Sequence, residues 1–254
     1  MALPGSVSTP KDHPRYKSLI VRERLAEMVE KGLVNPTGLI SQGRGEAYDY
    51  LMGEKSLDSS LNAEKAAAAY LLRAQKPVVC VNGNAAVLDP INLIKLAECI
   101  PAKMEINIFH RSEVRMELLI SYMEAAGACG VLGRNPDSRI PGLTSDRALC
   151  TKEGIFDSDV ILVPIEDGDR AEALVAMGKI VISIDLNPLS RTSKTASVSV
   201  SDEMTRALEN IIRFISELKG DEEEISRIIS DFSNMSCRKE TVKSICDSLM
   251  SEFE

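Results

Sequence analysis

Four short apolar runs rich in valine and isoleucine, separated by stretches of helical periodicity, are the feature that most constrains the fold of this chain. They lie at residues 77–81, 104–109, 160–164 and 180–184, and a fifth candidate at 196–200 alternates small or apolar residues with serine. Uninterrupted runs of this kind are typical of strands buried on both faces, which occur mainly in parallel sheets. Their alternation with helices predicts an α/β fold with a doubly wound, mostly parallel sheet.

The segments around these runs have helical periodicity. Helices are expected at 16–31, 46–52, 64–74, 90–99, 112–126, 170–177 and 203–218, with a turn at 36–38. The acidic run at 220–224 marks a boundary before a small helical tail. We therefore expect an irregular arm (1–15) and helices packed on the main domain (1–76), the α/β core (77–218) and an acidic helical tail (219–254).

The net charge of the chain argues against some classes of partner. Thirty basic and 38 acidic residues give a formal net charge of −8. Surfaces that bind nucleic acid or anionic lipid need a basic excess, so neither nucleic acid nor a membrane surface is expected as a partner. Residues 217–254 alone carry a net charge of −5, so most of the negative charge belongs to the tail and not to the core.

Sequence signals for secretion, membrane insertion and thiol chemistry are weak. No run reaches the ~18 apolar residues of a membrane-spanning helix, and residues 1–17 lack the apolar core of a signal peptide. The six cysteines form no CxxC pair, which argues against a zinc ribbon or a dithiol redox centre. A cytoplasmic protein with reduced thiols is expected.

Polar residues follow four of the apolar runs directly. They are Asn82-Gly83-Asn84, His110-Arg111, the segment 166–170 and the segment 185–192. The carboxyl ends of parallel strands meet at one edge of the sheet, where open α/β folds bind their ligands. Four such clusters favour one shared crevice, although strand-to-helix loops are often polar without having a ligand.

The segment Gly43-Arg44-Gly45 is an incomplete phosphate-binding signature. The third glycine of GxGxxG is absent, since position 48 is tyrosine. As a turn, the segment would let backbone N–H groups approach an anion, beside Arg44 and the N-terminus of a helix that begins at Glu46. An ordinary tight turn is the alternative.

Two further segments have functional and structural interpretations. Asp185 and Asn187 close an apolar run, where they can reach a ribose, and the hydroxyls and cations of 190–195 suit a polyphosphate; an exposed polar loop is the alternative. Glu166, Asp167 and Asp169 could hold Mg²⁺ or could simply cap a helix. No nucleophile elbow of the GxSxG type is present, so covalent hydrolysis is not indicated.

Taken together, the motifs resemble those of the archaeal phosphopantothenate synthetases (4-phosphopantoate–β-alanine ligases), over about residues 11–216. The segments that carry the resemblance are His13-Pro14-Arg15-Tyr16, Arg22-Glu23, Gly43-Arg44-Gly45-Glu46-Ala47, Asp49-Tyr50-Leu51, Val81-Asn82-Gly83-Asn84, Arg139-Ile140-Pro141-Gly142-Leu143, Glu166-Asp167-Gly168-Asp169-Arg170 and Asp185-Leu186-Asn187-Pro188-Leu189-Ser190-Arg191. Gln42 stands where the family is expected to have histidine, and Ser201-Asp202-Glu203-Met204 also departs from the family pattern. The tail from about 218 shows no resemblance.

The resemblance implies a homodimeric, Rossmann-like enzyme of coenzyme A biosynthesis with a nucleotide-binding core at 77–218. Such enzymes condense 4-phosphopantoate with β-alanine to 4′-phosphopantothenate, converting ATP to AMP and pyrophosphate through an acyl-adenylate. On matching positions, it implies ATP contacts from Arg22, Arg44, Asp185, Leu186, Asn187, Arg191, Thr192, Asp202 and Glu203.

This chemistry brings two polyanions together, and like unit charges ~4 Å apart cost ~4 kcal/mol near a protein surface. Several fixed cations and Mg²⁺ are therefore needed more than a general base. We expect catalytic roles for Arg44, Asp169 and Arg170, substrate binding by Asn82, Asn84, Arg111 and Arg139, and Mg²⁺ at Asp167 and Asp169. Asp169, His110 and bulk water all stay open as acceptors of the proton from the β-alanine amine.

Two other classes of function use the same crevice. A dinucleotide-dependent oxidoreductase would retain NAD or NADP on purification, but a GxGxxG after the first strand is missing. A non-catalytic sensor of a phosphorylated metabolite would show ligand-dependent thermal shifts without turnover.

Overall fold

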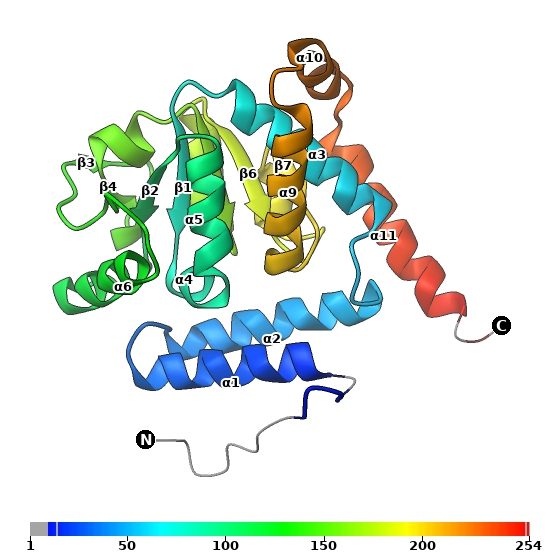
Figure 1. Cartoon of the computed structure of the whole chain (residues 1–254), viewed down its shortest axis with the longest axis horizontal. Coiled ribbons are helices and arrows are strands. Elements are labelled where there is room, and N and C mark those ends of the chain that lie inside the picture. Colours follow the sequence, from blue (N-terminus) through cyan, green and yellow to red (C-terminus); the bar gives the residue numbers. More distant parts are fainter. Residues whose placement is uncertain (1–9, 14, 252, 254) are drawn as a thin grey trace.

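Five parallel strands form the central sheet, in the order β2-β1-β5-β6-β7 (Figure 1). The structure is a computed structural model that describes residues 10–13, 15–251 and 253; residues 1–9 and Pro14 of the expected arm lie outside them. The strands are β1 (Pro77–Val81), β2 (Lys103–Ile106), β5 (Val160–Pro164), β6 (Ile180–Ile184) and β7 (Val198–Val200). Every neighbouring pair in this sheet is parallel, which confirms the predicted α/β fold.

The strand order creates a topological switch point between β1 and β5. The chain passes from β1 to β2 on one side and later returns to β5 on the other side. Connections that diverge in this way open a crevice at the carboxyl ends of the two strands. Asn82 bridges these ends, since its Nδ2 donates to the carbonyl oxygens of Pro164 (2.9 Å) and Ile165 (3.0 Å).

Alternate residues of the strands enter two separate apolar cores, one on each face of the sheet. Val79 and Val81 face the larger core, whereas Val78 and Cys80 face the smaller one. The larger core is covered by α3 (Asp58–Arg73), α5 (Pro90–Cys99), α6 (Glu113–Ala125) and α9 (Met204–Leu218). The smaller core is covered by α7 (Gly168–Ala176) and by the antiparallel hairpin of β3 (Ser138–Arg139) and β4 (Leu149–Cys150). Burial on both faces explains why the strands appear as continuous apolar runs.

Helix α2 (Pro36–Leu51) differs most from the sequence-based expectation. The sequence predicts a turn at 36–38 and a helix only from Glu46, but the structure has one continuous helix. Asn35 caps it by accepting a hydrogen bond from the Thr37 backbone N–H (3.0 Å), and Pro36 occupies the first helical position. The predicted anion-binding turn at 43–45 is therefore wrong, because these residues lie inside α2.

The glycines of α2 allow it to lie close to the carboxyl edge of the sheet. A Cβ on Gly38 would overlap Oδ1 of Asn84, and a Cβ on Gly45 would lie 3.4 Å from Cδ1 of Leu186. Figure 1 shows α2 and α1 (Tyr16–Glu30) side by side across this edge, below the short helix α4 (Gly83–Leu88). The two N-terminal helices thus cover the crevice.

Other elements differ from prediction mainly at their boundaries. Helix α3 begins at Asp58 and not at 64, and β7 begins at Val198 and not at 196. Strand β2 ends at Ile106 and not at 109, because the Asn107 side chain turns to the hairpin and donates to the carbonyl oxygen of Leu149 (2.9 Å). Helix α4 is not predicted, since six residues are too few for a periodic signal.

The tail is helical, as predicted, and forms α10 (Glu222–Asp231) and α11 (Asn234–Ser251). Lys65 of α3 pairs with Glu224 (3.0 Å). Asn234 covers the free edge of β7, because its Oδ1 accepts from the backbone N–H of Ser199 (2.9 Å) and its Nδ2 donates to the carbonyl oxygen of Ala196 (2.9 Å). Among the described residues, no helix is long and apolar enough to cross a membrane.

The contact between Gly83 and the α1–α2 connection generates a stability prediction. A Cβ at position 83 would lie 2.5 Å from the carbonyl oxygen of Leu33, so Gly83→Ala is expected to destabilise the fold by about 1–3 kcal/mol. Gly43→Ala is the matched control, because that Cβ meets nothing within 4 Å. It should stabilise α2 by about 0.5–1 kcal/mol. Urea unfolding measures both, and equal stabilities for the two variants would contradict the tight approach.

Candidate functional site

Two adjoining cavities lie between α2 and the carboxyl ends of the strands. The β1–β5 cavity, about 350 Å³, is lined by Asn35, Thr37, Gly38, Ser41, Asn82, Gly83, Asn84, Ile108, Phe109, His110, Arg115, Arg147, Ile165 and Asp167. The β6–β7 cavity, about 50 Å³, is lined by Ser41, Gln42, Gly45, Leu88, Ile165, Ile184, Asp185, Leu186, Asp202, Glu203 and Met204. Ser41 and Ile165 line both cavities, and all four polar strand ends contribute to the pair, as the shared crevice predicts.

Ile165, between the two cavities, has a strained backbone. Its φ is 51°, a left-handed conformation that is unfavourable for a β-branched residue. Hydrogen bonds hold it there: its N–H donates to the carbonyl oxygen of Ile184 (3.0 Å), and its own carbonyl oxygen accepts from Asn82. Such strain costs of order 1–3 kcal/mol and concentrates at functional sites, which supports assigning function to this edge.

The β6–β7 cavity gathers four of the residues that the resemblance assigns to ATP. These are Asp185, Leu186, Asp202 and Glu203. The Asp185 carboxylate accepts hydrogen bonds from the Asn187 backbone N–H (3.0 Å) and from Ser190 Oγ (2.5 Å), which fixes the loop after β6. Burial raises the pKa of the Asp185 carboxyl.

The carboxylates of Asp202 and Glu203 are occupied by the protein itself. Asp202 is 1% exposed and accepts from Ser56 Oγ and from Arg206 Nη2 (2.6 Å). Arg206 also donates to Asp49 Oδ1 (2.5 Å), which ties α2 to α9. Glu203 caps α9 by accepting from the backbone N–H groups of Thr205 (2.9 Å) and Arg206 (3.2 Å). A ligand at these two positions would therefore contact the backbone groups of Asp202 and Glu203 and not their carboxylates.

The other residues assigned to ATP surround this cavity without lining it. Arg44 is exposed on α2, beside the cavity-lining Gly45. Arg22 pairs with Glu46 (2.9 Å), and Arg191 pairs with Glu172 (2.8 Å). These three guanidiniums lie at the surface, where they can approach an anion.

Asn187 and Thr192 shape loops near the same cavity. Asn187 Oδ1 accepts from the backbone N–H of Leu189 (2.9 Å). Thr192 is buried, and its Oγ1 donates to the backbone carbonyl oxygen of Glu166 (2.7 Å). The Thr192 side chain therefore connects the segment after β6 to the loop after β5, whereas the Asn187 side chain stabilises its own loop.

In the β1–β5 cavity, the predicted substrate residues Asn82 and Asn84 have internal partners. Asn82 joins β1 to β5 and also accepts from the Ala85 backbone N–H (3.0 Å), which caps α4. Asn84 Nδ2 donates to the carbonyl oxygen of Gly38 in α2 (2.9 Å). Both residues line the cavity, and their hydrogen bonds set its shape. His110, which the sequence leaves open between packing and acid–base roles, is exposed on the cavity wall.

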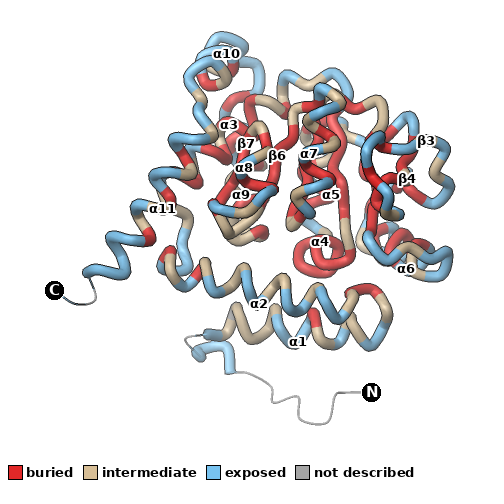
Figure 2. The backbone as a smooth tube through the Cα atoms, turned by 180° about the vertical axis from the view of Figure 1, so that it is seen from behind, coloured by how far each residue is buried: buried red, intermediate tan, exposed pale blue. Residues whose placement is uncertain are grey.

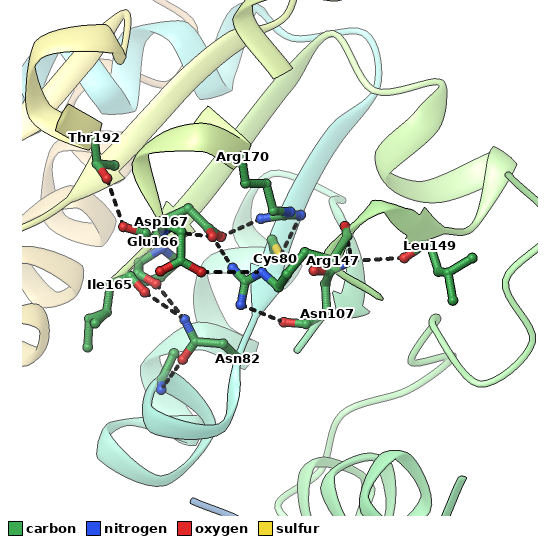
Figure 3. Close-up of polar contacts among 12 residues, drawn as sticks. Cys80, Asn82, Asn107, Arg147, Leu149, Ile165, Glu166, Asp167, Arg170 and Thr192 are labelled. Atoms are coloured by element: carbon green, nitrogen blue, oxygen red, sulfur yellow. Dashed lines mark hydrogen bonds and ion pairs between the residues drawn. The ribbon is translucent and has the colours of Figure 1, made fainter. Parts of the chain in front are cut away.

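Figure 3 shows Glu166 between two arginines at the base of this cavity. Nη2 of Arg147 and Nη1 of Arg170 donate to different oxygens of the Glu166 carboxylate, and all three side chains are buried. Burial alone would raise the pKa of Glu166, but the two guanidiniums outweigh it and hold that pKa below its usual value. We call these three residues the Glu166 cluster.

Arg170, predicted to be catalytic, lies beneath the cavities and lines neither of them. Its side chain is 1% exposed and also contacts Cys80 Sγ (3.3 Å). In this position its guanidinium donates to Glu166 and does not face either cavity. Any effect of Arg170 on the reaction must therefore pass through the Glu166 cluster.

The acidic residues at the start of α7 provide limited capacity for a metal ion. Asp167 lines the β1–β5 cavity, Asp169 is exposed beside it, and Glu166 is committed to its arginines. Partial desolvation, together with the neighbouring carboxylates of Glu166 and Asp169, raises the pKa of Asp167. Within the described part of the chain, no group of three His, Cys, Asp or Glu side chains could hold a metal ion. Asp167 and Asp169 therefore fit only a Mg²⁺ ion whose remaining ligands are phosphate oxygens and water.

The predicted substrate residues Arg111 and Arg139 are not brought into the two cavities. Arg111 donates to the carbonyl oxygen of Gly133 (2.7 Å) and lines a separate cavity of about 610 Å³ along α6. Burial lowers the pKa of Arg111. Arg139 is exposed on β3 and donates to the carbonyl oxygen of Leu143 (3.2 Å).

Two arginines of the β1–β5 cavity were not singled out from the sequence. Arg115 of α6 donates to the carbonyl oxygens of Gly32 (3.3 Å) and Leu33 (3.1 Å) and so positions the α1–α2 connection. Arg147 lies between the two-residue strands β3 and β4, which are too short to give a strand signal. No sequence pattern around Arg147 indicates that it reaches the sheet edge.

An open parallel sheet with a topological switch point, and two polar cavities at its carboxyl edge, define a Rossmann-like ligand-binding protein. Residues 59–248 match the family model described as phosphopantothenate/pantothenate synthetase. The chain therefore belongs to the phosphopantothenate/pantothenate synthetase family. This match includes most of the tail, so the expectation that the tail lies outside the family pattern is wrong.

The names of similar proteins agree with the family match. The chain is 50% identical over 241 residues to a Methanosarcina mazei protein named 4-phosphopantoate–β-alanine ligase, covering 94% of this chain and 95% of that protein. Proteins of the same name from Methanospirillum hungatei (52% over 213 residues, 84% and 87% covered) and Thermococcus kodakarensis (44% over 230 residues, 90% and 88% covered) are also similar.

A buried acid beside the β6–β7 cavity generates a pH-dependent prediction. Burial and the neighbouring Asp202 carboxylate raise the pKa of Glu64 to about 9. In the unfolded chain the pKa of glutamate is about 4.3. Between this pH and the folded pKa of about 9, unfolding releases a proton from Glu64. Glu64 therefore lowers the free energy of unfolding as the pH rises through this range. Glu64→Gln should therefore match the wild type near pH 4 and exceed its stability by a few kcal/mol at pH 8.

Urea unfolding across this pH range tests the effect of Glu64. The control is Glu98→Gln, an exposed residue of α5, which should keep the wild-type pH dependence. If Glu64→Gln also keeps that dependence, Glu64 is ionised in the folded protein and the prediction fails.

Proposed function

We propose that this protein is a 4-phosphopantoate–β-alanine ligase, which makes 4′-phosphopantothenate for coenzyme A biosynthesis at the expense of ATP. The observation that carries this function is the similarity to ligases of that name at 44–52% identity along nearly the whole chain. Two connected cavities of unequal size at one sheet edge suit a reaction that joins a nucleotide to an acid. The segment 43–45, inside a helix, does not form the phosphate-binding turn of a dinucleotide enzyme.

The reaction requires the carboxylate of 4-phosphopantoate to become an electrophile. A carboxylate oxygen attacks the α-phosphorus of ATP, pyrophosphate leaves, and an acyl-adenylate forms. The amine of β-alanine then attacks the acyl carbon, loses a proton and expels AMP. Both steps bring anions together, so fixed cations and pre-oriented donors contribute most to the rate.

ATP is assigned to the β6–β7 side of the edge. Asp185 and the loop 186–192 lie where a ribose hydroxyl and the phosphates can reach them, and Arg22, Arg44 and Arg191 supply positive charge at the rim. About 50 Å³ is far less than a nucleotide needs, so the phosphates extend past Ser41 and Ile165 toward the β1–β5 cavity. Gln42 lines this path as an uncharged donor and acceptor, in place of the histidine expected in the family.

The acid substrate is assigned to the β1–β5 cavity. Asn82 and Asn84 shape its walls, and Arg115 and Arg147 provide charge there. Mg²⁺ would enter with the phosphates of ATP and take Asp167 and Asp169 as its protein ligands, where it would neutralise charge on the phosphates. Asp169 and His110 remain the side-chain candidates that accept the proton of the amine.

The setting of the enzyme follows from the same assignment. We propose that it acts in the cytoplasm, where coenzyme A precursors and ATP are available, and that it works as a homodimer, as its resemblance to the family implies. The contributions of Arg111 and Arg139, outside the two cavities of one chain, would then be made in the assembled dimer.

The mechanism predicts the nucleotide product and the path of one oxygen atom. Incubation with ATP, Mg²⁺, β-alanine and 4-phosphopantoate labelled with ¹⁸O in its carboxylate should give AMP that carries one ¹⁸O atom. Mass spectrometry of the nucleotide measures this transfer, and omission of β-alanine is the control for slow leakage from the adenylate. Formation of ADP together with inorganic phosphate that carries the ¹⁸O would indicate an acyl phosphate and exclude the acyl-adenylate.

The assignment of Arg44 to ATP predicts a kinetic effect without a stability effect. Arg44→Ala removes one charge-assisted contact, which should raise the KM for ATP about 10-fold or more. Because the side chain is exposed, the stability should change by less than about 0.5 kcal/mol. Arg213→Ala, an exposed residue of α9 that pairs with Glu217, should keep the wild-type KM. A wild-type KM in Arg44→Ala would remove Arg44 from the ATP site.

A further inference from the structure

Among the residues that the structure describes, Arg147 is the one guanidinium that combines deep burial with an opening to the β1–β5 cavity. It is 5% exposed, it lines the cavity, and it comes from the β3–β4 hairpin, far in sequence from the other wall residues. Figure 3 shows it beside the loop that carries Ile165, Glu166 and Asp167. A buried arginine needs a complete set of hydrogen-bond partners, because an unpaired charge is costly to bury.

The partners of Arg147 are incomplete in the protein alone. Its Nη2 donates to Glu166, and its Nη1 makes a long contact of 3.4 Å with the carbonyl oxygen of Asn107. Its Nε is buried and donates no hydrogen bond to any described residue. Glu166 is shared with Arg170, so one carboxylate serves two buried guanidiniums.

Asp167 does not complete this set. Its Oδ2 lies 3.9 Å from the Arg147 Nε, beyond hydrogen-bond distance, and its side chain is 53% exposed. The cavity therefore presents a partly satisfied guanidinium, and a planar, negatively charged ligand group would satisfy it best.

We propose that Arg147 binds the carboxylate of the acid substrate and holds it for attack on the nucleotide. The proposal rests on the proposed function, and it adds the atom that Arg147 contacts. The substrate has two anionic groups, but only the carboxylate must approach the α-phosphate of ATP. Arg147 lies at the matching end of the cavity, since its partner Glu166 directly follows Ile165, which also lines the β6–β7 cavity. The phosphate group then lies toward Arg115 and His110.

The Glu166 cluster fixes the orientation of the Arg147 guanidinium for this contact. Arg147 is held on one side by Glu166, and Glu166 is held in turn by Arg170 and by the backbone N–H of Asp167 (2.8 Å). A guanidinium anchored in this way is pre-organised and loses little conformational freedom on binding. Arg147 is thus a substrate-binding residue, whereas Glu166 and Arg170 are positioning residues.

Calorimetric titration of three ligands separates a carboxylate contact from a phosphate contact. The ligands are 4-phosphopantoate, its carboxamide analogue and pantoate without the phosphate. The wild type should bind the acid about 10- to 100-fold more tightly than the amide, as expected for hydrogen bonds to a charged group. Arg147→Gln should lose about the same factor for the acid and almost nothing for the amide.

Arg213→Gln is the matched control, because Arg213 is an exposed arginine of α9 that lines neither cavity. This variant should keep the preference for acid over amide even if its melting temperature falls. Arg147→Lys, which keeps the charge and loses the planar fork, should retain part of the preference. Should Arg147→Gln fail to fold, the wild-type titrations and Arg147→Lys still decide the matter.

Three results would overturn the proposal: equal affinity of the wild type for acid and amide, equal losses for acid and amide in the Arg147 variants, or a loss that disappears when the phosphate is removed. The last result would assign Arg147 to the phosphate. Binding needs no turnover, so these outcomes are independent of the proposed function. That function fails separately, if the wild type forms no AMP from ATP, 4-phosphopantoate and β-alanine.

Discussion

The active edge of this protein depends on one buried carboxylate. Glu166 receives hydrogen bonds from Arg147 of the β3–β4 hairpin and from Arg170 of α7, while its backbone carbonyl oxygen accepts from Thr192 of α8 (Arg191–Thr195). Buried ion clusters contribute little net stability, but the removal of one member leaves an unpaired charge and is strongly unfavourable. Three segments that follow different strands are therefore fixed to one point (Figure 3). The strands beside this point, such as β6, are buried along most of their length (Figure 2).

The sheet was predictable because its strands are buried on both faces, which gives each strand an unbroken apolar run such as Val78–Val81 or 160–164. Helix α2 was not predictable in the same way. Its glycines at 38, 43 and 45 favour a turn by local propensity, but tertiary contacts decide the outcome. Two of these glycines face Asn84 and Leu186 at the sheet edge, where a larger residue would separate the helix from the site.

Sequence reasoning predicted which edge of the sheet carries the candidate site, but it predicted the contacts of individual side chains less well. Parallel strands bring Asn82, Asp167 and Asp185 to one edge, which follows from topology alone. Local sequence does not show that the side chains of Asn82 and Asp202 bind Pro164 and Ser56, because these partners lie far away in the chain. Arg147 was not predicted either, because it reaches the sheet edge through the pairing of β3 and β4, and strands of two residues give no local sequence signal.

The loop after β6, which the resemblance assigns to ATP, is held from outside the sheet as well. Nε of Arg238 in α11 donates to the carbonyl oxygen of Pro188 (2.7 Å), and Nδ2 of Asn234 donates to that of Ser193 (3.1 Å). Helix α11 therefore holds this segment at two points, Pro188 and Ser193. The loop is thus held by a helix that contributes no residue to either cavity, so substitutions in α11 are expected to alter the position of this loop without removing a cavity-lining side chain.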